Sequence, residues 1–336
     1  PRHWGVPYKP ARYLSPFAGS LERGQGIKML KVAWDPLYVL PLPANHRFPM
    51  SKYEVLPEQL LHEGTISHSN IFSPAPARED RILLAHERSY WEKLSTLALS
   101  PKEARRTGFP LSRELVDREC LIMGGTLQCA HFALKYGVAM NIAGGTHHAF
   151  TYKGGGFCLL NDIAIAASHL LDQQLARKIL VVDLDVHQGD GTAQIFRNEP
   201  RVFTFSMHGA NNYPMVKETS DLDIGLPDST EDLFYLRTLR ANLDNILDQF
   251  DPDFIFYQSG VDVLKTDKLG KLALTREGCR ERDRIVLSQA KAGGIPLVAS
   301  MGGGYSTHFR DIIEAHANTY RLAQEIFFRS FYIRGL

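Results

Sequence analysis

Short apolar segments alternate with longer amphipathic segments along the chain from Leu30 onward. Apolar runs of this kind are typical of parallel strands buried on both faces, and apolar residues at intervals of three and four indicate helices that connect them. The predicted strands span residues 31–34, 137–143, 178–186, 201–207, 253–259 and 295–301. The clearest predicted helices span residues 159–172, 231–249 and 275–292. The pattern therefore predicts an α/β fold.

The composition excludes several classes of protein. With 336 residues, 44% of them hydrophobic, the chain can fill a large core, and its formal net charge of +1 gives no electrostatic reason to expect a nucleic-acid partner. No apolar run approaches the ~18 to 20 residues needed to cross a bilayer, so we expect a soluble protein with no membrane partner. The four cysteines lie far apart without a CxxC pair, which favours free thiols in a reducing, cytoplasmic compartment.

Residues 1–30 differ from the rest, with five Lys or Arg residues, one acid, four prolines and no helical periodicity. We expect them to form a flexible N-terminal extension. An organellar targeting segment is the less favoured alternative, because the prolines would break the amphipathic helix that such signals use.

Acidic and histidine residues lie at the end of the predicted strand 178–186. Because strand side chains alternate between faces, Asp183, Asp185 and His187 share one face. Burying two carboxylates and an imidazole together is costly unless a positive charge holds them, which indicates a divalent metal. A pair of helix caps is the alternative interpretation of this short motif.

Asp262 follows the predicted strand 253–259 and could complete a three-ligand site with Asp185 and His187. Three protein ligands leave a position for water, as in catalytic metal sites. One imidazole and two carboxylates fit Zn²⁺, and the oxygen-rich set would also admit Fe²⁺, Mn²⁺ or Co²⁺.

Glycine-rich motifs follow two other predicted strands. In Gly144-Gly145-Thr146-His147-His148, the tandem histidines can present both imidazoles to one cavity as proton-transfer groups. In Gly302-Gly303-Gly304-Tyr305, the glycines allow the backbone to approach a ligand and place a phenol at the mouth of the strand. A phosphate-binding turn is the alternative for the second motif.

Together and in this order, the motifs resemble those of the histone deacetylase superfamily, over residues 31 to about 325. The chain is most similar to the class IV group and its bacterial relatives. The matching segments are PLPANHRFPMSKYE at 41–54, GGTHHAF at 144–150, GFCLLNDIA at 156–164, LDVHQGDGTA at 184–193 and YQSGVDVLKTDKLGKLALT at 257–275. The resemblance implies a catalytic domain over residues 31–336 with three α/β/α layers and a mostly parallel sheet, as in the arginase/deacetylase fold.

The resemblance also implies roles for individual residues. The implied metal ligands are Asp185, His187 and Asp262. The implied catalytic residues are His147 with its partner Asp183, His148 with its partner Asp190, and Tyr305. The implied substrate-binding residues are Gly156, Phe157, Tyr213 and Gly303. A potassium site is implied at Asp183, Asp185, His187, Ser206 and Met207. Arg47 is similar to an arginine beside a channel below the metal.

The implied activity is zinc-dependent hydrolysis of the amide that joins an acetyl or longer acyl group to a lysine side chain. His148 is expected to be the general base and His147 to act electrostatically, although the two roles could be exchanged. Tyr305 and the metal would stabilise the oxyanion. The expected partner is an acylated lysine protein or peptide, or an acylated small amine. Similarity to class IV implies a preference for long fatty acyl groups.

Two positions depart from the family pattern. Asp190 stands where class IV members commonly have Asn, and Gly155 stands where bacterial relatives often have Glu. The sequence also offers no obvious substitute for the rim aspartate that holds the substrate backbone in class I members, so we expect loose peptide selectivity.

Three other functions are compatible with the same residues. An acylpolyamine or small-amide deacetylase would use the same chemistry behind a different tunnel mouth. An arginase-like ureohydrolase would share the fold, but residues 259–264 offer one acid where a two-metal site needs more. An inactive acyl-lysine-binding scaffold is disfavoured, because every residue with an implied metal-binding or catalytic role is present.

Overall fold

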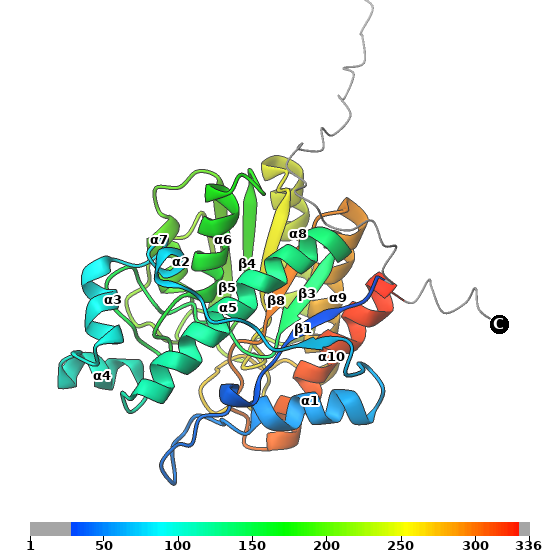
Figure 1. The fold of residues 1–336 in the computed structure, drawn as a ribbon. Helices are drawn as coiled ribbons and strands as arrows, with labels where there is room; N and C mark the ends of the chain where they lie inside the picture. The colour runs from blue at the N-terminus through cyan, green and yellow to red at the C-terminus, as the bar shows by residue number, and fades with distance from the viewer. Residues whose placement is uncertain (1–27, 329–336) are drawn as a thin grey trace, which may run out of the picture.

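Eight strands form one sheet within residues 28–328, the part of the chain that the computed structural model describes (Figure 1). Their order across the sheet is β2-β1-β3-β8-β7-β4-β5-β6. The strands are β1 Lys31–Ala33, β2 Ile71–Phe72, β3 Val138–Asn141, β4 Ile179–Asp183, β5 Val202–Gly209, β6 Leu222–Leu226, β7 Phe254–Gln258 and β8 Leu297–Ser300. All neighbours are parallel, so the carboxyl ends of the strands meet at one edge of the sheet.

Helices form a layer on each face of this sheet (Figure 1). α5, α6 and α7 pack together on one face, and α8, α9 and α10 pack together on the other, where α1 joins them. The helices are η1 Pro36–Tyr38, α1 Lys52–His62, α2 Glu79–Ile82, α3 Arg88–Ser95, α4 Pro101–Thr107, α5 Arg113–Tyr136, α6 Asp162–Asp172, α7 Asp190–Phe196, α8 Asp232–Phe250, α9 Arg276–Gly293 and α10 Phe309–Phe328. The predicted α/β class and the three α/β/α layers are therefore confirmed.

All six predicted strands are present, but the end predicted for the strand at 178–186 is wrong. β4 ends at Asp183: the N–H of Leu184 still donates to the carbonyl of Gln258 in β7, but the N–H groups that follow it bind side-chain oxygens. The N–H of Asp185 donates to Oδ1 of Asp183 at 3.2 Å, and the N–H of Val186 donates to Oδ1 of Asp262 at 2.9 Å. The chain thus leaves the sheet where its chemically active residues begin.

The two strands at the edges of the sheet were not predicted. β2 has only two residues, and the first four residues of β6 are partly or fully exposed. An edge strand needs no continuous apolar run, so neither segment has the hydrophobic pattern of the buried strands. Residues 1–27 of the predicted N-terminal extension lie outside the described residues.

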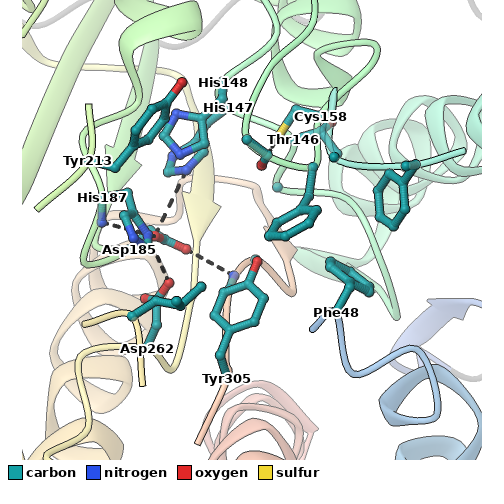
Figure 2. A pocket seen from close by; sticks show the side chains of 18 of the residues that line it. Phe48, Thr146, His147, His148, Cys158, Asp185, His187, Tyr213, Asp262 and Tyr305 are labelled. Carbon is teal, nitrogen blue, oxygen red and sulfur yellow. Dashed lines mark hydrogen bonds and ion pairs between the residues drawn. The ribbon is translucent and has the colours of Figure 1, made fainter. Parts of the chain in front are cut away.

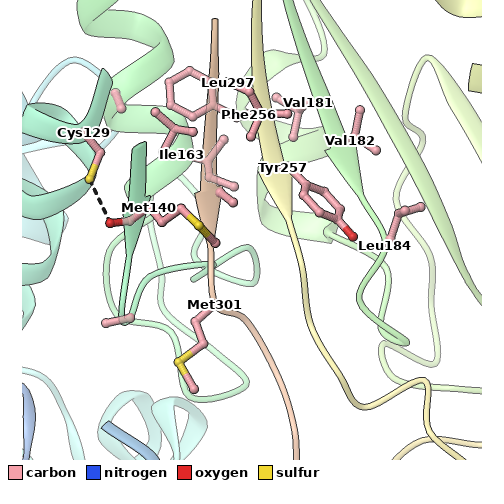
Figure 3. Packing of buried hydrophobic residues seen from close by; sticks show 14 of the residues in the cluster. Cys129, Met140, Ile163, Val181, Val182, Leu184, Phe256, Tyr257, Leu297 and Met301 are labelled. Carbon is pink, nitrogen blue, oxygen red and sulfur yellow. Dashed lines mark hydrogen bonds between the residues drawn. The ribbon is translucent and has the colours of Figure 1, made fainter. Parts of the chain in front are cut away.

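The hydrophobic core lies between the central strands and the helices on both faces (Figure 3). Every residue of β3, β4, β7 and β8 is buried, as the continuous apolar runs predict. Val181, Phe256 and Leu297 from three adjacent strands are at most 1% exposed, and Ile163 of α6 belongs to the same cluster. No helix among residues 28–328 combines the length and apolar character needed to cross a bilayer.

A buried arginine of α9 holds together the carboxyl ends of two central strands. The Arg282 side chain is 0% exposed and donates to the carbonyl oxygens of Leu184, Ser259 and Gly260, at 3.2, 3.2 and 2.6 Å. Asp283 balances its charge at 2.7 Å. Because these carbonyl groups directly follow β4 and β7, Arg282 fixes the spacing between the segments that carry Asp185 and Asp262.

Candidate active site

A cavity of about 530 Å³ opens at the edge where the carboxyl ends of the strands meet (Figure 2). Its walls come from segments far apart in sequence, including the loops after β3, β4, β5, β7 and β8. Ligand sites in parallel α/β sheets form at this edge. The glycine-rich and acidic motifs of the sequence therefore converge on one space.

Three potential metal ligands meet in this cavity. Nδ1 of His187 lies 3.0 Å from Oδ1 of Asp185 and 3.2 Å from Oδ2 of Asp262. One ligand atom from each residue falls within a group whose members are all within 4.8 Å of one another. Among residues 28–328, this is the one group of three or more such side chains that could hold a metal ion.

The charge of this group fits a divalent cation. Asp185 and Asp262 are 1% and 0% exposed, and burial together with the charge of Asp185 raises the pKa of Asp262 to about 7. When no cation is bound, Asp262 therefore tends to keep a proton, because a second negative charge buried beside Asp185 is unfavourable. A divalent cation bound to both carboxylates would stabilise their charged forms in its place, and imidazole and carboxylate are suitable ligands for zinc.

The backbone beside the two carboxylates is equally specialised. The N–H of Gly303 donates to Oδ2 of Asp185 at 2.9 Å. A Cβ atom at position 303 would lie 2.0 Å from Oδ2 of Asp262 and 2.8 Å from Oδ2 of Asp185. Gly303 thus lines the cavity without a side chain because both carboxylates occupy that space.

His147 lies beside the metal-binding group and is paired with Asp183. Nδ1 of His147 is 2.7 Å from Oδ2 of Asp183, and Nε2 is 3.9 Å from Oδ1 of Asp185. Burial opposes protonation of His147, but Asp183 and Asp185 outweigh this effect and raise its pKa to about 9. In this environment the imidazole carries a positive charge at neutral pH.

His148 has the opposite electrostatic character. Its Nδ1 is 2.6 Å from Oδ1 of Asp190, yet burial and the neighbouring charge of His147 lower its pKa to about 4. Gly156 packs directly on its ring: a Cβ at position 156, where φ is +53°, would lie 2.5 Å from Cδ2 of His148. His148 is therefore a neutral imidazole at neutral pH, held by a carboxylate on one side and by bare backbone on the other.

A buried aspartate holds the loop that carries the two histidines. Oδ1 of Asp162 accepts hydrogen bonds from the N–H and the hydroxyl of Thr146, both at 2.9 Å. Its Oδ2 accepts from the hydroxyls of Thr126 and Ser300 at 2.7 and 2.8 Å. Asp162 was not predicted from the sequence; in the structure it is the first residue of α6, directly after the N-cap residue Asn161.

Tyr305 faces the metal-binding group from the loop after β8 (Figure 2). Its N–H donates to Oδ2 of Asp267 at 2.6 Å, and the other oxygen of Asp267 accepts from the N–H groups of Leu269 and Gly270. Burial and the nearby acids Asp262 and Asp185 raise the pKa of Tyr305 well above its usual value. The phenol therefore stays protonated and can donate a hydrogen bond.

Aromatic rings form the walls of the cavity. The ring centroid of Phe157 lies 5.2 Å from that of Phe48, 5.5 Å from that of Phe109 and 5.9 Å from that of Tyr305. Tyr213 packs on the far side, 4.9 Å from the ring of His148. Phe157 and Tyr213 both line the cavity, as do Phe48 and Phe109, which were not identified from the sequence.

The expectation for Arg47 is wrong. Arg47 is exposed at the mouth of the cavity, with its guanidinium carbon 5.1 Å from the centroid of Phe157. Two other cations of this region are buried: Lys52, whose Nζ donates to the carbonyl of Gly302 at 3.0 Å, and Arg118, which is paired with Glu119. The sequence places Arg47 and Lys52 in the same motif, and only the path of the loop shows which side chain points inward.

The residues of the predicted potassium site lie on two adjacent strands and the loop after β4. Asp183 of β4 pairs in register with Ser206 of β5, and Met207 is the next residue along β5. Asp185 and His187 lie in the loop that follows β4. The five residues are therefore neighbours at the carboxyl edge of the sheet.

Residues 46–320 match the family model described as the histone deacetylase domain. The chain belongs to the histone deacetylase family. An uncharacterised protein of Picosynechococcus sp. is 45% identical over 296 residues, which cover 88% of this chain and 99% of that protein. Histone deacetylase 2 of Arabidopsis thaliana is 30% identical over 271 residues, 77% of this chain and 70% of that protein.

Solved structures of histone deacetylases have the same fold. A histone deacetylase homologue from Aquifex aeolicus superposes with a TM-score of 0.76 at 26% identity, covering 88% of this chain and 84% of that chain. The HDA15 HD domain superposes with a TM-score of 0.74 over 89% of this chain and 88% of that chain, and at 19% identity it shows the fold alone. These matches confirm the predicted superfamily and fold, and make this histone deacetylase family member a deacetylase-type hydrolase in a generally metal-dependent family.

Proposed function

We propose that the chain is a zinc-dependent hydrolase that removes acyl groups from lysine side chains of proteins or peptides. The observation that carries this proposal is the meeting of four chemical elements in one cavity: a three-ligand group, a charged histidine, a neutral histidine and a protonated phenol. Hydrolysis of an unactivated amide needs a general base, a proton donor for the amine and stabilisation of the oxyanion.

Asp185, His187 and Asp262 would hold the zinc ion, and Fe²⁺, Mn²⁺ or Co²⁺ could replace it in this oxygen-rich set. A divalent cation bound there supplies Lewis acidity, which polarises the carbonyl group and lowers the pKa of water. Gly303 supports the site by donating its N–H to Asp185.

His148 would be the general base. Because Asp190 binds its Nδ1, Nε2 is the nitrogen available in the cavity, and its lowered pKa keeps that nitrogen unprotonated. Nε2 would take a proton from water as the oxygen adds to the acyl carbon. The C–N bond then breaks, and the same proton passes to the departing lysine amine, giving a carboxylic acid and an amine; the acid proton then moves to the amine, so the products are a carboxylate and a lysine ammonium group.

His147 and Tyr305 would stabilise the charge that develops during the reaction. His147, kept positive by Asp183, acts electrostatically and positions the site from beside Asp185. Tyr305 donates its hydroxyl proton in a hydrogen bond to the carbonyl oxygen as that atom becomes negative. Phe157, Gly156 and Tyr213 would border the lysine side chain between them.

We also propose a potassium ion near Asp183, Asp185, His187, Ser206 and Met207, where it would support the loop after β4. The acyl group would extend towards the inner end of the cavity, which is lined by Tyr53, Phe109 and Ile122 as well as by Arg118 and Glu119. This inner space supports the long acyl groups implied by the similarity to class IV. An acylated small amine remains the second candidate substrate, because the chemistry at the amide would be the same.

The decisive experiment measures hydrolysis of acetyl-, octanoyl- and myristoyl-lysine versions of one peptide, with and without a chelator. We expect turnover that is lost with the chelator and restored by Zn²⁺. Three further assays test the other functions. Hydrolysis of an acylated polyamine tests the small-amide deacetylase, hydrolysis of arginine tests the ureohydrolase, and binding of the acyl-lysine peptide without hydrolysis tests the inactive scaffold. Hydrolysis of the polyamine or of arginine alone, or binding without turnover, would overturn the proposal.

A further inference from the structure

The mouth of the cavity carries four exposed cationic side chains: Arg47, Arg105, Arg106 and Lys271. The acidic residues that line the same cavity, Glu119, Asp185 and Asp262, are all buried inside it. The outer part of the cavity is therefore positively charged, while the net charge of the whole chain is only +1. The positive charge is concentrated where a substrate would enter.

These four cations have no acidic partner within the described part of the chain. No carboxylate oxygen there lies within 4.0 Å of their charged nitrogens, whereas many surface arginines, such as Arg88 and Arg201, are paired with glutamates. Glu103, the acid nearest in sequence to Arg105 and Arg106, binds Lys93 at 3.2 Å and the N–H of Ser100 at 2.8 Å. Their positive charge is thus available to a molecule at the mouth.

The positions of the acids around Lys271 lead to the same conclusion. Asp267, four residues earlier, points its oxygens at the backbone N–H groups of Leu269, Gly270 and Tyr305. Asp228 accepts from the side chain of Asn211, itself at the mouth, at 3.3 Å. The local acids hold the loops in place and leave Lys271 unpaired.

Helix electrostatics explains only part of this arrangement. Arg105 and Arg106 lie in the last turn of α4, where cations favourably oppose the helix dipole. Arg47 precedes α1 and Lys271 follows β7 in irregular loops, so no dipole accounts for them. Cations from three separate segments that surround one opening are better explained by a ligand than by each helix or loop alone.

We propose that this mouth selects acylated lysines flanked by acidic side chains, that is, acidic peptide segments. The inference rests on the proposed acyl-lysine hydrolase activity and names its substrate class. Carboxylates beside the acyl-lysine would meet the four cations while the lysine side chain enters between Phe157 and Tyr213. Lysine-rich segments and acylated polyamines would be repelled by the same charges.

The effect should depend on salt, because exposed ion pairs are individually weak and are screened within about 10 Å at 0.1 M ionic strength. Several such pairs acting together should give about a tenfold or larger preference in kcat/KM for an acidic peptide over its basic counterpart at low salt. The preference should shrink to about threefold or less near 0.5 M salt.

The test uses three peptides with the same acyl-lysine and with aspartate, serine or lysine at the two residues on each side. Turnover of the serine peptide tests the proposed function separately from the charge preference. Binding of the same three peptides, followed by fluorescence anisotropy, measures the preference even in the absence of turnover. Equal kcat/KM values and equal affinities for all three peptides would overturn the inference.

Charge-reversal variants locate the effect. In Arg105→Glu/Arg106→Glu, and separately in Lys271→Glu on a loop, the preference for the aspartate peptide should fall at least about threefold, while the serine peptide keeps its turnover. Arg237→Glu, an exposed and unpaired position on α8 away from the cavity, is the matched control and should leave the preference unchanged. An unchanged preference in both mouth variants would also overturn the inference.

Discussion

Oδ1 of Asp190 lies 2.6 Å from Nδ1 of His148 and 3.0 Å from the N–H of Gly191. One carboxylate oxygen therefore orients the imidazole and is itself fixed by the first turn of α7. The contact raises the pKa of His148, while burial and the charge of His147 lower it more strongly. Asp190 is thus the group that opposes the loss of basicity at His148.

Replacing Asp190 with Asn should lower the pKa of His148 further, because the imidazolium would lose its carboxylate partner. The acidic limb of the kcat/KM profile, where His148 gains a proton, should move to lower pH. The plateau should fall about tenfold or more, because a weaker base removes the proton less well. Metal content should stay at the wild-type level. An acidic limb that moves to higher pH would contradict the proposed pairing.

Tyr305→Phe should keep the ring packed against Phe157 and remove only the hydroxyl. Loss of one oxyanion donor typically lowers kcat about 10²- to 10³-fold. We expect this fall with unchanged metal content and an unchanged melting temperature. Tyr152→Phe, which removes a hydroxyl from a tyrosine outside the cavity lining, is the control. Wild-type kcat in Tyr305→Phe would remove the phenol from the mechanism.

Asp262→Ala should abolish metal binding and activity together. The purified chain should hold about one divalent ion, and chelation should lower its melting temperature, because the bound ion stabilises only the folded state. In Asp262→Ala the chelator should have little effect on melting. Asp228→Ala, which changes an acid outside the cavity lining, should behave like the wild type. Two tightly bound ions per chain would favour the ureohydrolase alternative instead.

Ile122→Phe should shorten the inner end of the cavity without touching the metal-binding group. Each buried methylene contributes about 0.8 kcal/mol, so blocking space for several carbons should lower kcat/KM for octanoyl- and myristoyl-lysine by at least tenfold. Acetyl-lysine should be affected about threefold or less. In the wild type, a steady fall of kcat/KM with acyl length would show that the inner space does not receive the acyl chain, and would remove the preference implied by class IV.

The sequence predicted the central strands well because each is buried on both faces and reads as an apolar run. It did not predict β2 and β6, where partial exposure removes that pattern. The predicted helix over 159–172 begins at Asp162, since the side chain of Asn161 accepts the N–H of Ala164 at 3.0 Å and caps it. Such ends depend on local hydrogen bonds rather than on periodicity.

The three candidate metal ligands could be predicted because they follow those apolar runs. Asp185, His187 and Asp262 directly follow predicted strands, and parallel topology brings those ends together. Phe48, Phe109, Lys52 and Arg282 gave no comparable signal. Their roles come from tertiary contacts between segments distant in sequence. The sequence alone does not show which polar or aromatic residue of a loop or helix faces the cavity or the strand ends.

The parallel sheet also divides the molecule into a reactive edge and an opposite edge that takes no part in lining the cavity. The connections before β4, β7 and β8, at residues 173–178, 251–253 and 294–296, all lie on that opposite edge and contribute no lining residue. Leu175 in the first of them is 42% exposed, while the cysteines among residues 28–328 are buried or half-buried free thiols. A cysteine introduced at position 175, in a variant that also carries Cys120→Ser, would therefore give a handle for attaching the protein to a surface with its cavity facing the solution.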